Sequence, residues 1–569
     1  MNSAQLSDPT SEVDPVTSAD ASDVEKGSFE GAKENSNLSS RPEDINISVS
    51  KREVISALAL NDNVVDFDGL DDPQRPLNWP MGKKVLNTVL YSFCTMGSTW
   101  ASTIYASGIP QVQSQFQVSA EIGVLGVSLF LFGNAFGPLL FAPLSEYYGR
   151  KISVLLPAFF CMVFSFATAT SKDIQTLLLT RFFAGVFASA PLSNVGGVLA
   201  DIWPPQHRGA ALLVYGVAVI VGPLIAPIVG GALVLNLQRT GWRWTEYITG
   251  ILLAVILVTS IFGIDESFPP VLLSRKANKL RHETKNWAIR SKQQETDYSL
   301  KDMSRKYFVV PFEMIVDPIC FVINLYAAFC YAIIYLAILT FPIEFQEKRG
   351  WNSVVGSLPF LAMLVGVAIG GAINMWSQKF YVTRLVANNN KAVPEARLLP
   401  MMIGSIFFAA GFFIMGWTSD PSIPWIGFCV GAACIGLGFF TIFQSAINYL
   451  VDTYLMLAAS ALAANMLMRS VLAGAFPLFA TTMFNKLGIN WACSLLGFIS
   501  VAMIPIPFLY YLIVPIPISI IARGLSEILT IKHQQLAEDR SNGSWQNQWL
   551  GHMRFPLSHD LVGFSAMFY

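Results

Sequence analysis

The 569-residue chain contains 53% residues of the set AVILMFWYC and only 13% charged residues, whereas an average soluble domain carries about 25% charged residues. Its 41 Phe outnumber the 37 Lys and Arg together, so too little polar material is present to cover the surfaces of several soluble domains. The formal charge of −1 excludes a globally basic nucleic-acid binder. The composition therefore indicates a protein whose main solvent and partner is the lipid bilayer, not water or nucleic acid.

The first 66 residues are acidic and rich in serine, with 13 Asp or Glu and 5 Lys or Arg. Few apolar residues recur there in a periodic order, so the segment cannot bury enough surface to offset the entropy cost of ordering it. We expect residues 1–82 to form a disordered acidic N-terminus in the cytoplasm. A small folded acidic domain is the alternative.

Twelve largely uncharged apolar runs follow, each about as long as the 20 residues that a membrane helix needs. Six lie between residues 83 and 264, and six lie between residues 318 and 522. Residues 265–317, with 10 Lys or Arg in a helical, charged pattern, separate the two sets. This layout predicts an all-α membrane protein with twelve transmembrane helices in two six-helix bundles, joined by a cytoplasmic central loop. Residues 523–569 are expected to form a cytoplasmic C-terminal tail.

The orientation in the membrane follows from the basic residues of the connections. If the N-terminus is inside, the inner connections hold 17 Lys or Arg and the outer ones hold 6. Without the long central loop, which counts less under this rule, the comparison is 7 to 6. We therefore expect both termini in the cytoplasm, an orientation that relies on one basic pair, Arg150 and Lys151, and on the resemblance described next.

The connection between the second and third runs reads GPLLFAPLSEYYGRK, from Gly137 to Lys151. Gly149 permits a tight turn, Glu146 can face the N-terminus of the following helix, and Arg150 stays with the inner leaflet. From the residues alone, a basic loop that only sets the topology is an open alternative. The segment resembles the cytoplasmic loop motif of the major facilitator superfamily, in the form found in fungal drug:proton antiporters.

The fourth run contains LLLTRFFAGVFASAPLSNVGG, in which Arg181 lies within the apolar run or at its outer edge. An arginine inside a membrane is energetically expensive, so by default it marks a functional position. Arg181 resembles the fourth-helix arginine of the same superfamily, which is implicated there in proton transfer. The alternative is an interfacial arginine whose side chain extends outward to the lipid headgroups.

The fifth run contains GVAVIVGPLIAPIVGG, in which small residues recur at every fourth position: Ala218, Gly222, Ala226 and Gly230. They make one helical face smooth enough for another helix to approach closely. Pro223 and Pro227 each remove a backbone donor and bend the helix. With its ending at Gly230 and Gly231, the segment resembles the antiporter motif of the superfamily, which is associated with exporters rather than uptake carriers. A purely structural stripe of small residues is the alternative.

The resemblance extends over roughly Asp66 to Pro507 and implies a secondary transporter whose two bundles rock about a cavity near the membrane midplane. No GxxxxGKS or GxxxxGKT sequence occurs that could cradle the phosphates of ATP. The energy must then come from an ion gradient, and the resemblance implies protons. We expect no cofactor and no metal site, and we predict that the chain is not an enzyme.

The sequence leaves the proton carrier open, because no apolar run has an Asp or Glu in its middle. The nearest acids are Glu246 at the outer end of the sixth run, Asp201 at the inner end of the fourth, and Asp452 between the tenth and eleventh. Asp201 and Asp452 are typical of helix ends, and Glu246 is also compatible with a surface pair with Arg243. We count Glu246, with Arg181, among the candidate coupling residues.

An uncharged cavity lined by aromatic and amide side chains suits neutral or amphipathic aromatic molecules better than strongly cationic ones. Gln444 and Asn448, one turn apart in the tenth run, are the candidate cavity residues, and a hydrogen bond between helices is their alternative role. We therefore predict proton-driven export of a small lipophilic or amphipathic compound, such as a fungal secondary metabolite or a drug, at the plasma membrane or, alternatively, the vacuolar membrane. A polyamine or nutrient transporter of the same superfamily, and a sensor that kept the fold without transporting, stay as alternatives.

Overall fold

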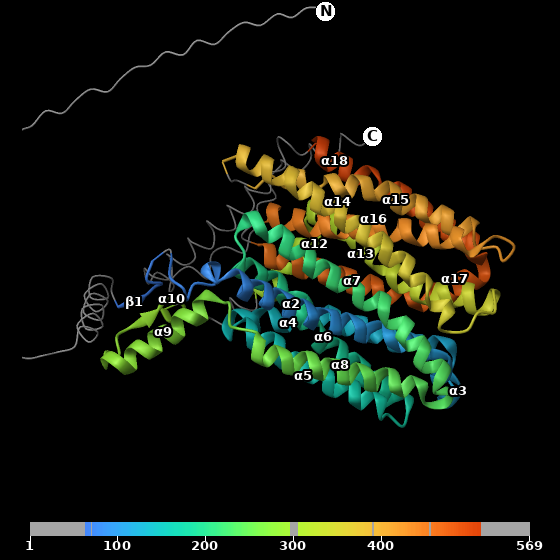
Figure 1. The fold of residues 1–569 in the computed structure, drawn as a ribbon, viewed down its shortest axis with the longest axis horizontal. Coiled ribbons are helices and arrows are strands. Elements are labelled where there is room, and N and C mark those ends of the chain that lie inside the picture. The colour runs from blue at the N-terminus through green and yellow to red at the C-terminus, as the bar shows by residue number, and fades with distance from the viewer. Residues whose placement is uncertain (1–62, 70, 296–304, 390–391, 455–456, 514–569) are drawn as a thin grey trace, which may run out of the picture. The chain divides into compact units, whose positions relative to one another are not determined.

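The computed structural model describes most of the chain, namely residues 63–69, 71–295, 305–389, 392–454 and 457–513. Helices make up nearly all of the described residues, in agreement with the predicted all-α class (Figure 1). The acidic segment 1–62 and the C-terminal tail 523–569, about which the sequence made predictions, lie outside the described residues.

The first half of the structure begins with α2 (Met81–Thr103), which continues through a 3-10 turn, η2 (Ile104–Gly108), into α3 (Ile109–Phe116). Each of the following five helices is joined to the next by a short connection. They are α4 (Ala120–Tyr147), α5 (Arg150–Ala169), α6 (Ile174–Ile202), α7 (Pro205–Asn236) and α8 (Gly241–Gly263).

The second half repeats this plan after a central segment. Its helices are α13 (Pro318–Pro342), extended by a π-helical turn to Lys348, α14 (Pro359–Ala387), α15 (Leu399–Trp417), α16 (Trp425–Thr453), α17 (Ala458–Met503) and α18 (Pro505–Ile513). Short 3-10 turns, η6 (Val355–Ser357) and η7 (Pro394–Arg397), precede α14 and α15.

Ten helices of the described residues are long and apolar enough to cross a membrane, with Ala458–Leu512 counted as one. Gly488 splits that range into two helices, because its φ of 74° and ψ of 161° are not helical. The chain reverses there: the Tyr510 ring lies 6.0 Å from the ring of Tyr449, near the end of α16, and its hydroxyl donates to the carbonyl of Ile319. A straight helix from Ala458 would carry Tyr510 about 78 Å away.

The first predicted span, α2, is not among these ten because its face toward the protein is rich in Ser and Thr. Their hydroxyls donate to backbone carbonyls one turn earlier, as Thr88 does to Lys84 and Thr95 to Tyr91. These bonds satisfy the polar groups within the helix, as a membrane requires. With α2 and the division at Gly488, the structure agrees with the predicted twelve helices.

Each half is held together by close helix contacts, and fewer contacts join the halves. In the first half, α4 and α5 pack on α6, and α2 packs on α7; in the second, α14 and α15 pack on α16, and α13 packs on α17. Glycines allow these approaches: a β-carbon at Gly185 of α6 would collide with the Phe130 carbonyl of α4. The halves meet mainly where α4 packs on α17 and α7 on α14.

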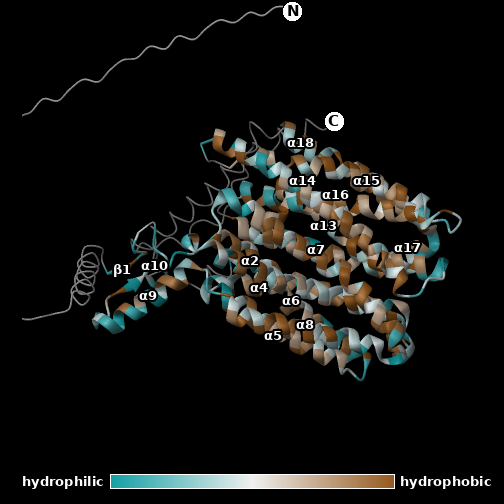
Figure 2. Ribbon diagram, viewed as in Figure 1, coloured by the Kyte–Doolittle hydropathy of each residue, from teal (hydrophilic) through white to brown (hydrophobic). Residues whose placement is uncertain are grey.

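Hydrophobic residues run along the bundle helices, whereas hydrophilic residues gather in the connections and along the central segment (Figure 2). Large exposed apolar side chains, including Phe262, Val255 and Trp491, lie on the outward faces of these helices. Trp417 and Trp491 pair with a ring separation of 6.0 Å close to one end of the bundle. Apolar belts with aromatic residues near their edges are typical of surfaces that lipid covers.

The central segment is partly folded and packs on residues that precede α2. It contains α9 (Pro269–Thr284), β2 (Arg290–Ser291), α10 (Lys292–Glu295) and α12 (Val310–Val316). The two-residue strand β2 pairs in parallel with β1 (Val64–Val65), which the sequence did not predict. Residues 63–69 and 71–80, assigned from the sequence to the disordered N-terminus, are therefore ordered, because α9 and β2 supply backbone and charged partners for them.

Lys276 of α9 provides one such partner. Its ammonium lies 2.6 Å from Asp68 and 3.8 Å from Asp72. Burial raises the pKa of the Asp72 carboxyl, but bonds from the backbone N–H groups of Asp68 and Gln74 and the charge of Lys276 outweigh it, so this pKa lies below its ordinary value. The charged carboxylate thus holds the entry of α2 against the central segment.

Candidate functional site

Each end of the helix bundle is named after one residue, Arg150 or Gly231. The Arg150 end carries the turn between α4 and α5, and the central segment continues from it through Glu266. The Gly231 end carries the connection between α7 and α8. The sequence predicts that the Arg150 end faces the cytoplasm.

Arg181 of α6 and Glu246 of α8 form a buried ion pair toward the Gly231 end. Both side chains are 1% exposed, and Arg181 Nη1 lies 3.2 Å from Glu246 Oε1. The guanidinium also donates to three backbone carbonyls on α2 and α4: Ala101 at 2.8 Å, Ser102 at 3.2 Å and Gly126 at 3.2 Å. Burial excludes the alternative of an interfacial arginine that extends toward the headgroups.

Aromatic rings close this pair off on both sides. The guanidinium carbon of Arg181 lies 4.9 Å from the ring centre of Tyr105 and 4.6 Å from that of Phe130. The faces of aromatic rings attract cations, so the rings stabilise the charge while they exclude water. An ionised pair in such surroundings interacts strongly, because little solvent screens it.

Glu246 lies deeper than the sequence suggested. The apolar run begins at Tyr247, but the helix begins at Gly241, so Glu246 is about 8 Å along it. The expected surface pair with Arg243 is absent: Arg243 instead donates to the Ala169 carbonyl at 2.7 Å and faces the Trp242 ring. The second carboxylate oxygen of Glu246, Oε2, is buried without a hydrogen-bond partner among the described residues.

The turn at Gly149 is built around Glu266, not around Glu146. Gly149 has a φ of 100°, which glycine tolerates and L side chains rarely adopt. The Glu266 carboxylate accepts hydrogen bonds from the backbone N–H groups of Arg150 at 2.8 Å and Lys151 at 3.1 Å, an arrangement that the helix dipole favours. The expectation that Glu146 occupies this position is wrong; its side chain lines a cavity instead.

Arg150 is held within the protein at this turn. Its Nε lies 3.0 Å from Asp201 Oδ2 at the end of α6, and its Nη1 donates to Ser145 Oγ at 2.9 Å. The ring of Phe268 lies 4.7 Å from the guanidinium carbon. Arg150 is therefore part of an ion pair, and Asp201 is more than a residue of a helix end. That Arg150 lies at the cytoplasmic side stays a prediction.

The second half contains the same arrangement, which the sequence analysis missed. Arg397, just before the third helix of that half (α15), lies 2.8 Å from Asp452 at the end of the fourth (α16). It also donates to Gln378 at 2.6 Å and covers the Tyr381 ring at 3.3 Å. The signal that could have revealed it is the matching order of an Arg and an Asp in both halves, since internal repeats leave weak sequence symmetry between the halves of a chain.

The small residues of α7 face two different partners. A β-carbon at Gly222 would collide with Thr99 of α2, and one at Gly230 would collide with Ser107. The predicted smooth face therefore packs on α2 and its continuation η2. Gly231 points elsewhere: a β-carbon there would lie 2.6 Å from the carbonyl of Ser353 in the second half. Pro223 lies buried within α7, and the bend that it predicts stays a prediction.

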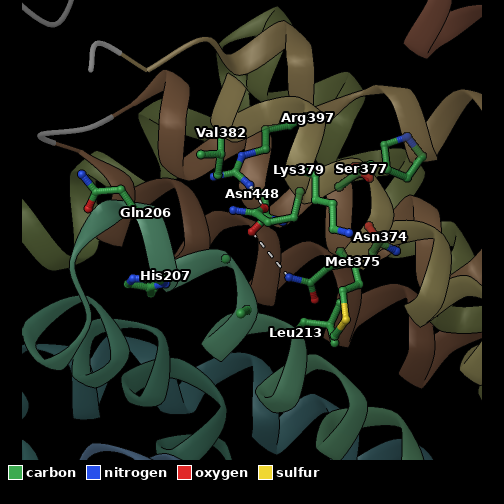
Figure 3. Close-up of a pocket in the computed structure, with 16 residues that line it drawn as sticks. Gln206, His207, Leu213, Asn374, Met375, Ser377, Lys379, Val382, Arg397 and Asn448 are labelled. Carbon is green, nitrogen blue, oxygen red and sulfur yellow. Dashed lines mark hydrogen bonds between the residues drawn. The ribbon is translucent and has the colours of Figure 1, made fainter. Parts of the chain in front are cut away.

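Two cavities lie between the halves. The larger, about 470 Å³, is lined by α7, α14 and α16, and both predicted cavity residues, Gln444 and Asn448, line it. Their amide groups lie 3.5 Å apart, so their bond is within one helix (Figure 3). Gln444 also reaches Gly216 of α7, where a β-carbon would collide with its Oε1, an atom without a hydrogen-bond partner among the described residues.

The second cavity, about 240 Å³, is lined by α4, α6, α7, α16 and α17 and by Arg150 at the start of α5. Its charged lining residues are Glu146, Arg150, Arg208 and Arg469. The sequence-based expectation of an uncharged cavity is therefore wrong. Arg469 was visible as the single charge in the eleventh apolar run, but only the packing of α17 against α13 and α16 shows which way it faces.

The comparison with protein families supplies the name of this architecture. The family model described as "Major Facilitator Superfamily" matches residues 91–477, which is more than half of the chain. The chain belongs to the major facilitator superfamily. This membership confirms the predicted fold class, and it confirms that the chain is a transporter of that superfamily and not an enzyme.

Known relatives agree with this membership. The transporter is 47% identical to "Efflux pump bik6" of Gibberella fujikuroi over 80% of this chain and 93% of that protein. It is 40% identical to "Citrinin biosynthesis cluster MFS transporter mrr1" of Monascus ruber, over 79% and 90% of the two chains. It is 38% identical to "Multidrug transporter TPO1_2" of Candida glabrata, over 78% and 77%. These relatives confirm the resemblance to fungal efflux proteins.

A solved structure shows the same fold. The proton:xylose symporter XylE bound to 6-bromo-6-deoxy-D-glucose superposes with a TM-score of 0.55 at 15% identity, covering 76% of the transporter and 97% of XylE. At this identity the likeness concerns the fold alone. The transporter is thus a multi-pass membrane protein of the superfamily's architecture.

Proposed function

We propose that this transporter exports a small organic compound from the cytoplasm in exchange for protons. The observation that carries the proposal is the Arg181–Glu246 pair, in which the carboxylate oxygen Oε2 of Glu246 is buried without a hydrogen-bond partner among the described residues. A proton can bind this oxygen without first displacing another donor. Relatives that are named efflux pumps and cluster transporters support export as the direction.

The pair is suited to link proton binding to a change of shape. Protonation of Glu246 removes the negative charge that balances Arg181, so the guanidinium must rely more on the carbonyls of Ala101 and Ser102. These carbonyls lie where α2 passes into the 3-10 turn η2. A proton at Glu246 therefore changes the forces on a helix junction that packs on α7.

The contacts between the halves define what must move. At the Gly231 end, Gly231 lies against Ser353 of the second half, whereas both cavities contain residues of the Arg150 end, such as Arg208 and Arg397. Release on the other side requires the contact between Gly231 and Ser353 to open. We place the transporter in the plasma membrane with both termini in the cytoplasm.

The test uses inside-out vesicles from cells that lack the native gene and express the transporter. An acidic lumen reproduces the outside of the cell, so we expect lipophilic compounds of a test panel to accumulate in the vesicles, and to leave when the pH gradient is collapsed. Arg181→Ala and Glu246→Gln should lose gradient-driven accumulation. Lys172→Ala and Glu121→Gln, which remove exposed charges, serve as matched controls.

Two results would contradict the proposal. Accumulation that persists without a pH gradient would exclude proton coupling. Failure of every compound of a broad panel, including polyamines and sugars, to accumulate would favour the alternative of a sensor that kept the fold.

A further inference from the structure

Arg469 lies deep in the smaller cavity, and no described acidic residue is paired with it. It is the twelfth residue of α17, so it lies about 16 Å from the start of the helix, near the middle of a hydrocarbon core about 30 Å thick. Its side chain is 4% exposed, and its Nε has no hydrogen-bond partner in the part of the chain that the structure describes. No carboxylate of the described residues forms an ion pair with it.

Aromatic side chains surround this guanidinium. Its carbon lies 4.9 Å from the ring centre of Tyr331 and 5.3 Å from that of Phe443, and the two rings stack on each other at 5.8 Å. The guanidinium also interacts with the hydroxyl of Tyr215. These groups stabilise a cation, but none of them supplies the negative charge that a buried arginine needs.

A second arginine lies toward the mouth of the same cavity. Arg208, the fourth residue of α7, donates from Nη2 to the Ala200 carbonyl at 3.2 Å. Its Nε is buried, and no described residue bonds to it. The acids whose negative charges act on Arg208 are Asp201 and Asp452. Both are already paired with other arginines, Arg150 and Arg397 respectively. Of the three arginines among the described lining residues, Arg150 is paired with Asp201, so Arg208 and Arg469 face a single lining carboxylate, that of Glu146.

We infer that the exported substrate is an organic anion, a carboxylate or phenolate on an aromatic body, whose charge binds Arg469. This inference rests on the proposed function and specifies its substrate class. Guanidinium and carboxylate match as paired donors and acceptors, and the ring of the substrate packs on Tyr331 and Phe443. Arg208, nearer the entrance, attracts the anion toward the cavity. The substrate thus provides the missing counter-charge, in place of the neutral substrate that the sequence suggested.

The experiment compares three probes that share one ring system: 2-naphthoate, the neutral 2-naphthalenemethanol and the cationic 2-naphthalenemethylamine. Equilibrium dialysis against the purified full-length transporter in nanodiscs, with empty nanodiscs as blanks, gives the affinities. We expect 2-naphthoate to bind at least tenfold more tightly than the alcohol, and the amine to bind most weakly. The comparison on the unmodified protein needs no variant to fold.

Variants then assign the preference to a residue. Arg469→Gln should bring 2-naphthoate and the alcohol to equal affinity while the affinity for the alcohol changes less than about twofold. Arg469→Lys, which keeps the charge but not the paired donors, should retain a preference of a few-fold. Lys172→Gln removes a remote charge and should keep the full preference. Circular dichroism and size-exclusion profiles confirm that each variant is folded.

Several outcomes would overturn the inference. These are equal binding of anion and alcohol, no measurable binding of either, tighter binding of the amine, or a preference that survives in Arg469→Gln. Vesicle accumulation driven by a pH gradient is measured in parallel. It distinguishes failure of the anion inference from failure of the proposed proton-coupled export. Export without an anion preference would overturn the substrate class only, and an anion preference without gradient-driven export would overturn proton coupling only.

Discussion

The hydroxyl groups of Ser102 on α2 and Tyr335 on α13 lie 3.0 Å apart and join the two halves of the transporter. Ser102 also accepts a hydrogen bond from Arg181 through its carbonyl at 3.2 Å. On the other side, Tyr335 is bonded to the Tyr331 hydroxyl at 3.2 Å, and the ring of Tyr331 faces Arg469. One row of contacts therefore links the candidate proton site to the candidate substrate site.

The first prediction concerns this row. Tyr335→Phe removes the hydroxyl that bonds to Ser102 and leaves the ring in place. We expect substrate affinity to change less than about twofold, while gradient-driven accumulation falls several-fold. The reason is that the halves lose the contact through Ser102, the residue whose carbonyl accepts from Arg181. Loss of one hydrogen bond destabilises the fold by only about 1 kcal/mol. Tyr91→Phe is the matched control, because it removes a buried hydroxyl that bonds to none of the residues that the structure describes. Equal effects of both variants would contradict the coupling role.

The second prediction separates charge balance from transport at the buried pair. Glu246→Gln leaves Arg181 buried without a counter-charge, and breaking such a pair destabilises a protein by about 3–5 kcal/mol. The double variant Arg181→Gln/Glu246→Gln removes both charges, so its thermal unfolding temperature should recover toward that of the unmodified protein. Gradient-driven export should be lost in both variants. Export by the double variant would show that the pair serves only stability.

The third prediction concerns the turn at Gly149. In Gly149→Ala the alanine backbone must keep a φ of 100°, and its new methyl group also collides with the Glu266 carboxylate. Gly488→Ala is the control, because its φ is 74° but its surroundings are open, so it should show only the strain of about 1–3 kcal/mol. We expect a clearly larger drop in thermal unfolding temperature for Gly149→Ala. Equal decreases in the unfolding temperature of the two variants would mean that the Glu266 side chain moves aside easily and does not fix the turn.

The fourth prediction distinguishes the two faces of α7. Gly222→Leu forces a large side chain between α7 and α2 within one half, so it should lower the unfolding temperature and the yield of folded protein. Gly231→Leu disturbs contacts with Ser353 and Ser357 of the other half. It should fold with nearly unchanged stability but export poorly, because the Gly231 end cannot close. Normal export by Gly231→Leu would show that this contact is not part of the cycle.

The sequence by itself determined the class of the protein and the positions of its helices. A membrane helix must satisfy its backbone internally and face lipid with apolar side chains, so long uncharged runs predict spans directly. Local motifs were equally informative: the residues around Gly149 predicted a tight turn, and the small residues of the fifth run predicted a close helix contact. The resemblance carried by these motifs led to the same family that the comparisons established.

Only the tertiary structure decided which charges meet. The partner of Arg181 lies 65 residues away, and that of the α5 N-terminus lies beyond three further helices, at Glu266. Nothing in the periodicity of one helix states which neighbour its polar face will meet. For the same reason Arg469 was visible in the sequence as an isolated charge, yet its position in a cavity, unpaired with any described acid, depends on how α17 packs between the halves.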